Sequence, residues 1–291
     1  MEHAELISGA LSDVKKSLFG LDNFPVWIRL FLQIIVPIVA GIIAATLLLQ
    51  IIVKPILVGS FVNDNFGFTE NGIAYMLQFA AVLFGFFCVF LVPLFQGFLY
   101  RLIRSDKFPD TGNRMALFFS GWRVNLVCLF YAVPLLVVYL ISAGLYVFFA
   151  DITGGSPVFD LIIYIIYAAI ILFLIFVVVL FAAISLVHVA RGASFKKAFS
   201  IRNSMRIIRQ IGWYNYLLSM VICTIVLLLI SVIFLGIGLG FAGVIAANII
   251  IIGVYIFLLI PVVIFCCRYV TRVYDAGMAP VAEDIEDFDD F

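Results

Sequence analysis

Long apolar stretches alternate with short polar connections along the whole of this chain. A helix needs about 20 apolar residues to cross the roughly 30 Å hydrocarbon core of a bilayer. Six stretches reach that length without a charged residue in their middle: residues 28–53, 72–100, 125–149, 159–187, 214–239 and 246–267. The pattern therefore predicts an all-α integral membrane protein with six transmembrane helices. The connections are too short for a further domain, which typically needs at least about 50 residues.

The two ends of the chain differ from this apolar middle. Near the N-terminus, apolar residues recur at helical spacing: Ile7, Leu11, Val14 and Leu18. They predict an amphipathic helix lying on the membrane surface. Residues 281–291 carry six acids and no base, a composition typical of disorder. The chain is thus expected to divide into a cytoplasmic amphipathic segment at 1–27, a six-helix transmembrane domain at 28–272 and an acidic disordered cytoplasmic tail at 273–291.

Composition excludes a soluble fold. Apolar residues make up 66% of the chain and charged residues 12%, where a soluble domain has about 25% charged residues. Lys and Arg balance Asp and Glu, so no basic excess points to a nucleic acid partner. The five cysteines all lie in apolar runs without a paired CxxC spacing, which indicates packing residues. Reversible redox chemistry or acylation is the alternative for the adjacent Cys266 and Cys267 near one end of a span. No cofactor or metal is expected.

The placement of charge predicts the orientation in the membrane. Every Lys and Arg except Lys54 falls on one side of the six spans, and positive charge in short loops is retained in the cytoplasm. Both termini are therefore expected to be cytoplasmic, and the protein is expected to lie in the plasma membrane of the cell. Trp27, Trp122 and Trp213 stand at the same ends of spans, where tryptophan rings commonly anchor a helix at headgroup level.

The connection between the fourth and fifth spans is the most informative segment. Arg202, Arg206 and Arg209 recur at i, i+4 and i+7 beside an apolar stripe, which predicts an amphipathic interfacial helix on the cytoplasmic side. Juxtamembrane cations attract an anionic leaflet, although they also serve simply to fix topology. The residues expected to contact anionic lipid headgroups or a protein partner are Arg101, Arg104, Arg191, Lys196, Lys197, Arg202, Arg206 and Arg209.

Uncharged polar residues and prolines interrupt the apolar spans. The amides that would form an intramembrane polar site, if they converged, are Gln33, Gln78, Gln96 and Asn248. Hydrogen bonds between helices are the alternative role for them. The prolines inside four spans are Pro37, Pro93, Pro134 and Pro261, and each is expected to kink its helix. Gly236 and Gly240, four residues apart in the fifth span, predict close helix packing rather than a nucleotide site.

Several short motifs follow one another in a fixed order. They are Pro25-Val26-Trp27, Gly97-Phe98-Leu99-Tyr100-Arg101, Phe108-Pro109-Asp110, Gly121, Tyr131 with Pro134, Arg206-Ile207-Ile208-Arg209 and Trp213-Tyr214-Asn215-Tyr216-Leu217. In this order they resemble the polytopic membrane family catalogued as domain of unknown function 4013, found mainly in archaea. The resemblance spans residues 24–276, with Phe108 where that family usually has leucine. It implies the same membrane architecture and carries over no catalytic residue.

Three functions remain as hypotheses. The first is a non-enzymatic scaffold or lipid-binding and partner-binding membrane protein, which rests on the placement of the cations. The alternative is a transporter or channel-like protein for a small apolar or weakly polar solute, which rests on the kinked spans and the four amides. An intramembrane enzyme is disfavoured, because no span contains paired carboxylates or an HExxH sequence, and the chain offers no convincing Ser and His pair. The oligomeric state is left open by the sequence.

Overall fold

The computed structural model describes residues 2–19, 23–55, 70–153, 157–241 and 244–286, which form helices and contain no strand. The elements are α1 (His3–Leu18), α2 (Phe24–Leu48), the π-helical turn η1 (Leu49–Val53), α4 (Glu70–Leu91), α5 (Leu94–Arg104), α6 (Arg114–Thr153), α7 (Pro157–Ala190), the short 3-10 helix η2 (Phe195–Phe199), α8 (Ile201–Ile211), α9 (Trp213–Gly240) and α10 (Ile245–Glu286). The expected all-helical class is confirmed.

Six helical segments are long and apolar enough to cross a membrane. They are Phe24–Val53, Gly72–Arg104, Arg114–Ile141, Leu161–Ala190, Trp213–Gly240 and Ala247–Met278. The predicted number of spans is therefore confirmed. The third segment begins before the expected residue 125, because residues 114–124 continue α6 toward its N-terminus instead of forming a loop.

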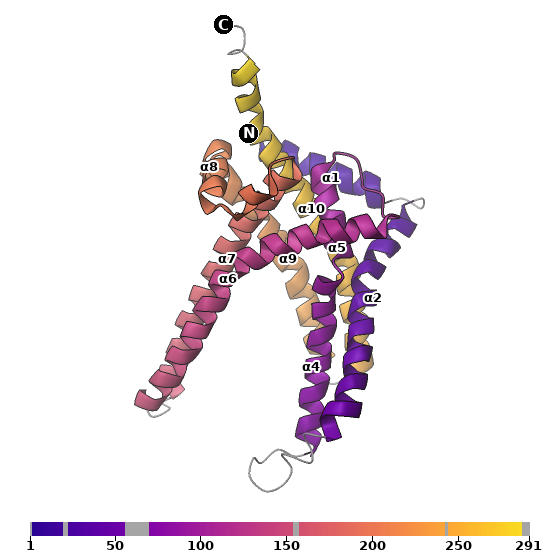
Figure 1. Ribbon diagram of the computed structural model, residues 1–291, viewed down its shortest axis with the longest axis vertical. Coiled ribbons are helices and arrows are strands. Elements are labelled where there is room, and N and C mark those ends of the chain that lie inside the picture. The colour runs from indigo at the N-terminus through magenta and orange to yellow at the C-terminus, as the bar shows by residue number, and fades with distance from the viewer. Residues whose placement is uncertain (1, 20–22, 56–69, 154–156, 242–243, 287–291) are drawn as a thin grey trace.

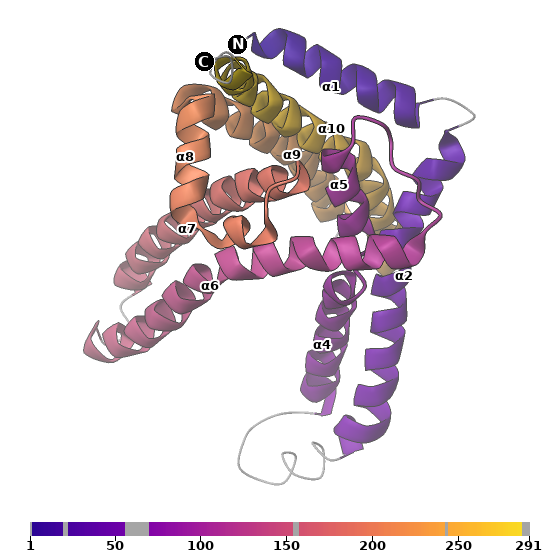
Figure 2. The ribbon, with the colours of Figure 1, turned by 45° about the horizontal axis from the view of Figure 1, so that its top comes forward.

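The helices pack mainly as sequential pairs: α2 lies along α4, α6 along α7 and α9 along α10. The α6–α7 pair diverges from the α2–α4 pair, as Figure 1 shows, while α6 first passes across α5. The beginning of α1 and the last turns of α10 lie at the same end of the molecule as α5 and α8 (Figures 1 and 2). Both ends of the described chain are therefore on one side of the spans.

The packed core lies at this end of the molecule. One cluster joins α8 to its neighbours around the fully buried Ile208, Tyr216 and Tyr269, and a second surrounds Leu30 and Phe98. Toward the other end the span side chains are largely exposed, for example 65% of Phe79. Exposed apolar surface on this scale suits contact with lipid tails, so the tertiary structure that can position a site is concentrated at the end that carries α1, α5 and α8.

Helix α1 is amphipathic, but its buried face differs slightly from the predicted one. Ala10, Val14 and Leu18 are buried, whereas Leu11 is 59% exposed. The helix packs along α10, where the His3 Nδ1 atom lies 2.8 Å from the Tyr269 hydroxyl. Its contacts with α10 fix α1 to the bundle, and its place on a membrane surface stays a prediction.

The last helix continues past the boundary expected at residue 272. Val273 and Tyr274 are buried, and the Asp275 carboxylate pairs with Arg191, so residues that were assigned to a disordered tail complete the core. Burial of the two apolar side chains and the ion pair of Asp275 stabilise these turns against the bundle, so α10 extends beyond the apolar span. The final residues of the predicted tail, 287–291, lie outside the described residues.

The second span is broken at Pro93, as expected for a proline inside a membrane helix. Helix α4 ends at Leu91 and α5 begins at Leu94. Pro93 has no N–H to donate to the Val89 carbonyl four residues earlier. The Gln96 side chain supplies the missing donor, because its Nε2 lies 3.2 Å from the Val89 oxygen. Gln96 thus repairs the break in its own span.

A second carbonyl at the same break is satisfied from another helix. The Leu94 N–H donates to the Val92 carbonyl at 2.8 Å, so it no longer serves the Phe90 carbonyl in the usual helical pattern. The buried Asn125 amide on α6 donates to that Phe90 oxygen at 2.7 Å. Since a buried carbonyl without a donor costs free energy, Asn125 stabilises the broken span in its bent form.

Pro261 in α10 frees the Phe257 carbonyl in the same way. The Trp27 indole N–H donates to that oxygen at 3.0 Å, and its ring stacks on Phe257 with centroids 4.6 Å apart. Trp27 is buried within the bundle, and its expected place at headgroup level stays a prediction. Its polar atom is used inside the protein, while Trp213 at the start of α9 remains exposed.

Two glycines allow α5 and α6 to cross at very close range. A Cβ atom at Gly97 would lie 1.8 Å from the Leu117 carbonyl oxygen, and one at Gly121 would lie 1.8 Å from the Pro93 carbonyl oxygen. By contrast, apart from its chain neighbours and the backbone of its own helix, no described atom lies within 4 Å of a Cβ placed at Gly236 or Gly240. The prediction of close helix packing at Gly236 and Gly240 is therefore wrong. Close packing occurs at the α5–α6 crossing instead.

Candidate functional site

The predicted basic connection folds into η2 and α8. Gly192 turns the chain out of α7 with φ +116°, and Ser200 caps α8 by accepting a hydrogen bond from the Asn203 N–H at 3.3 Å. Helix α8 buries Ile207 and Ile208 and exposes its arginines. The expected amphipathic helix is therefore present, with its position relative to a membrane still a prediction. Gly212, at φ +94°, ends the helix before α9.

A buried cluster of hydroxyl groups fixes this segment to the bundle. The Tyr131 hydroxyl on α6 donates to the Ala198 carbonyl of η2 at 2.8 Å and lies 2.8 Å from the Ser185 hydroxyl on α7. The Ser204 hydroxyl on α8 is 2.7 Å from that of Ser185. Four elements share these hydrogen bonds, so the backbone that carries the basic side chains has a defined position.

Four cationic side chains of this segment surround one hollow of about 340 Å³. Its lining residues are Lys196, Lys197, Ser200, Arg202, Asn203 and Arg206. The two lysines come from η2 and the two arginines from successive turns of α8, and all four side chains are exposed. No Asp or Glu is among these lining residues. We call this hollow the basic pocket.

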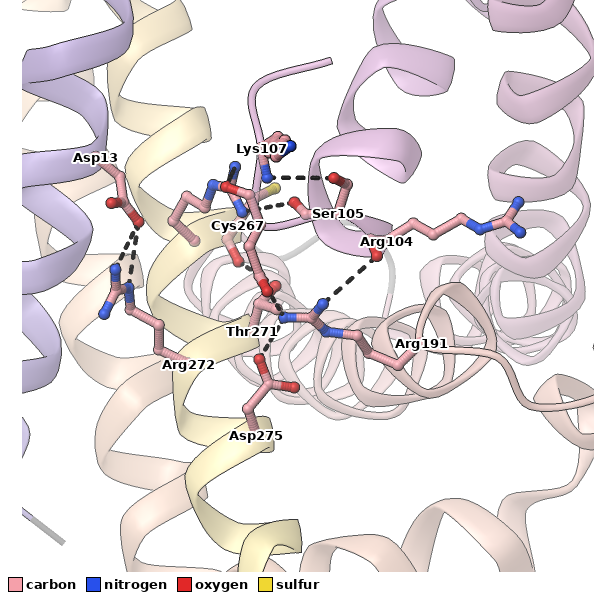
Figure 3. A network of polar contacts seen from close by, with 11 residues as sticks. Asp13, Arg104, Ser105, Lys107, Arg191, Cys267, Thr271, Arg272 and Asp275 are labelled. Carbon is pink, nitrogen blue, oxygen red and sulfur yellow. Dashed lines mark hydrogen bonds and ion pairs between the residues drawn. The ribbon is translucent and has the colours of Figure 1, made fainter.

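The other predicted contact residues lie elsewhere. Arg209 is exposed on α8 outside the lining of the basic pocket, while Arg101 and Arg104 lie on α5. Arg191 follows the end of α7 and points into a separate ion-pair network, drawn in Figure 3. The structure thus brings four of the eight predicted cations into one pocket.

The ion-pair network joins four parts of the chain. Arg191 pairs with Asp275 on α10 and, at 3.0 Å, with Asp106 in the connection after α5. Arg272 pairs with Asp13 on α1 at 2.8 Å. A cavity of about 400 Å³ lies among these five residues and Arg268. Three arginines therefore face three aspartates, which neutralises the charge within the network.

Arg268 occupies the most buried position in the network, with 6% of its surface exposed. Its guanidinium donates to the Ser105 carbonyl at 2.8 Å and to the Asp106 carbonyl at 3.0 Å. These carbonyls belong to the connection that leaves α5, so Arg268 holds this connection against α10. The network has a structural role that explains why its arginines are turned inward.

Hydrogen bonding to Arg191, followed by its positive charge, lowers the pKa of Asp106 below its ordinary value. A carboxyl group with a lowered pKa stabilises the fold above its ordinary pKa, and that contribution is lost as the pH falls through the lowered value. The Asp106 side chain is 86% exposed, so solvent screening keeps this contribution small. The contribution of the network to the stability of the fold therefore comes more from its buried members than from Asp106.

The four predicted intramembrane amides lie on four different helices, and no hydrogen bond among the described residues joins any two of them. Gln96 serves the Pro93 break, while Asn248 donates to the carbonyls at the end of its own hairpin. Gln78 is exposed, and the Gln33 Oε1 atom is buried without a partner among the described residues. An apolar hollow of about 480 Å³ between α9 and α10 is lined partly by Asn248 but by none of the glutamines.

Sequence reasoning missed the aspartates of the ion-pair network. Asp13, Asp106 and Asp275 lie in segments that also carry Lys and Arg residues, and this was the available signal. Their partners could not be assigned without the fold, because each pair joins residues more than 80 positions apart. Among the described residues, no group of three or more His, Cys, Asp and Glu side chains is arranged to hold a metal ion.

Together, the six apolar helices and their packed polar end define a multi-pass helical membrane protein. The chain belongs to the family described as "Protein of unknown function (DUF4013)", which it matches over residues 80–241. The matched region includes the Pro93 break, the α5–α6 crossing and the whole basic pocket. No curated protein and no solved structure matches the chain.

Proposed function

We propose that this chain is a non-enzymatic membrane protein that binds anionic lipid headgroups at its basic end. The observation that carries the proposal is the basic pocket, in which four cations share one hollow without an acidic lining residue. A cation beside an anionic leaflet contributes about 1 kcal/mol of attraction. Helix α8 presents its arginines to the outside and Ile207, Ile208 and Ile211 to the core, so lipid can reach the charges without unfolding of the helix.

The proposal includes an orientation in the plasma membrane. The end that carries α1, α5 and α8 would face the cytoplasm, in accordance with its positive charge. A reporter that fluoresces only in the cytoplasm is expected to be bright when fused after residue 291. When it is inserted between residues 60 and 61, in the connection on the opposite side, it is expected to be dark. The reverse pattern would contradict the orientation.

Charge removal from α8 tests the binding itself. The triple variant Arg202→Gln, Arg206→Gln and Arg209→Gln is expected to lose at least about ten-fold in retained anionic lipid, since three juxtamembrane cations contribute together about 3 kcal/mol. The measurement is native mass spectrometry of the protein released from nanodiscs that were formed directly from its own membranes. The ratio of anionic to zwitterionic lipid retained per protein is the quantity to compare.

A variant with the same change in net charge serves as the control. Lys15, Lys16 and Arg29 are exposed cations near the start of the chain, and their replacement by Gln is expected to leave most of the lipid bound. If both triple variants lose lipid equally, binding does not depend on α8. If the wild-type protein retains a second protein and no anionic lipid, the ligand is a protein partner and the lipid proposal fails.

Transport of a small solute has less support. The Gln96 and Asn248 amides donate to nearby backbone carbonyls, and the four amides share no hydrogen bond. A solute path needs polar groups that converge, because each isolated polar group in the membrane is costly. The basic pocket lies outside the apolar spans, where a headgroup would meet it.

A further inference from the structure

We infer that the basic pocket is a specific site for a phosphomonoester group, that is, a terminal phosphate with two negative charges. The inference rests on the proposed function and deepens it, because it replaces a diffuse attraction to anionic surface by one ligand class at one pocket. The residues concerned are Lys196 and Lys197 on η2 and Arg202 and Arg206 on α8, with Ser200 and Asn203 between them.

The first argument is the contrast between two sets of cations at the same end of the molecule. Arg191 and Arg272 are paired with aspartates, and Arg268 is satisfied by backbone carbonyls. The four cations of the basic pocket have no acidic residue in their lining. Like charges at i and i+4, as in Arg202 and Arg206, destabilise a helix. A bound anion would remove this repulsion, and a doubly charged group would do so most effectively.

The second argument is geometry. A phosphomonoester offers three terminal oxygens, which accept bidentate hydrogen bonds from arginine and point-charge contacts from lysine. The pocket provides two side chains of each kind, and it adds the polar side chains of Ser200 and Asn203. Its volume of about 340 Å³ lies at the lower end of the range for ligand sites, which suits a phosphate with the adjoining part of a headgroup.

The third argument is that the pocket is held in place before a ligand arrives. Ala198, which directly follows Lys197, is buried, and its carbonyl accepts a hydrogen bond from the Tyr131 hydroxyl. Helix α8 is fixed through Ser204 in the same hydroxyl cluster. A site whose backbone is already ordered loses less entropy on binding, so it can select one ligand instead of adapting to many.

The test compares two short-chain lipids that differ in the phosphate. The full-length protein in nonionic detergent is titrated with dioctanoyl phosphatidic acid, a phosphomonoester, and with dioctanoyl phosphatidylglycerol, a phosphodiester with one charge. Isothermal titration calorimetry at physiological ionic strength is expected to give at least about ten-fold tighter binding of phosphatidic acid, equivalent to about 1.4 kcal/mol. Inorganic phosphate, added as a competitor and titrated alone, distinguishes a lipid headgroup from a free phosphate.

Two double variants with equal loss of charge locate the site. The double variant Arg202→Gln with Arg206→Gln is expected to weaken the binding of phosphatidic acid by about ten-fold or more. It is also expected to abolish the preference for phosphatidic acid over phosphatidylglycerol. Lys15→Gln with Lys16→Gln, two exposed cations on α1 that lie outside the pocket lining, is expected to change the binding by less than about three-fold. Unchanged thermal unfolding midpoints show that both proteins keep their fold, as expected for exposed side chains.

The outcomes separate this inference from the proposed function. Equal affinity for the two lipids, weakened equally by both double variants, would overturn the phosphate pocket and leave general binding of anionic lipid in place. Absence of binding of either lipid to the wild-type protein would overturn both. If inorganic phosphate binds alone with the same dependence on Arg202 and Arg206, the pocket stands and its ligand is a free phosphate. If it does not compete, the ligand is the lipid.

Discussion

Replacement of Gly121 by alanine is expected to prevent the chain from accumulating as a folded protein. The added Cβ atom would lie 1.8 Å from the Pro93 carbonyl oxygen and 2.8 Å from the carbonyl carbon. These are backbone atoms, which cannot move aside as a flexible side chain can. Helices α5 and α6 would have to separate along their crossing, and overpacking of this kind costs at least about 1–3 kcal/mol even where side chains can adjust.

The expected result is a monodisperse peak in detergent for the wild-type protein and a loss of most of that peak for Gly121→Ala. Fluorescence-detected size-exclusion chromatography and the thermal midpoint of the remaining material are the measurements. Gly97→Ala is expected to behave in the same way, because its Cβ would lie 1.8 Å from the Leu117 carbonyl oxygen.

Gly236→Ala and Gly240→Ala are the matched controls in a second membrane helix. No described atom outside the neighbouring backbone of α9 lies within 4 Å of a Cβ at either position. Both variants are expected to keep the wild-type peak. Neither is expected to lose stability, because alanine is favoured over glycine in a helix by up to about 1 kcal/mol. If Gly121→Ala and Gly236→Ala unfold at the same temperature, the close crossing of α5 and α6 is not present in the protein.

These glycines illustrate what the sequence could and could not predict. The pair Gly236 and Gly240 is conspicuous and suggested close packing, but a Cβ atom at either position meets no neighbouring helix within 4 Å. Gly97 and Gly121 are isolated in sequence, and their requirement arises from the crossing of two helices. Close approach is a property of tertiary structure, so the spacing of glycines in one helix does not determine it.

The number of spans could be predicted because it depends on the length of local apolar runs. The amphipathic helix at 201–211 could be predicted for the same reason, since periodicity is also local. The partners of the arginines could not. Arg191 lies five residues before Lys196 in the sequence, yet it turns toward Asp106 and Asp275, while Lys196 lines the basic pocket.

The roles of the polar residues inside the spans could not be predicted from the sequence either. Gln96 was grouped with three other amides as a candidate site, but its amide replaces the donor that Pro93 lacks. Trp27 was predicted to anchor its helix at headgroup level, and the hydrogen bond from its indole N–H to the carbonyl that Pro261 frees was not foreseen. In both places the proline was visible in the sequence, and the side chain that compensates for it became identifiable only with the fold.

Replacement of Arg268 by glutamine is expected to have the second large effect, on stability. The guanidinium is almost fully buried and donates to the carbonyls of Ser105 and Asp106. Hydrogen bonds from a charged donor contribute about 1.5–3 kcal/mol each, so the loss of both is expected to lower the free energy of unfolding by about 3 kcal/mol or more. The measurement is unfolding in detergent by titration with sodium dodecyl sulfate.

Arg104→Gln is the control for this variant, because Arg104 is exposed on α5, next to the connection that Arg268 holds. Its removal is expected to change the free energy of unfolding by less than about 1 kcal/mol, as for exposed charges in general. An equal loss of stability in the two variants would show that the charge at this end matters and the buried hydrogen bonds do not.

A double variant separates the two causes of the Arg268 effect. Arg268→Gln leaves three aspartates facing two arginines, and a second change, Asp106→Asn, restores the balance of charge. Because the Asp106 side chain is largely exposed, this change is expected to recover little stability. The carbonyls of Ser105 and Asp106 would still lack their donor. Full recovery in the double variant would instead assign the loss to unbalanced charge, and the connection after α5 would then be held by the network as a whole and not by Arg268.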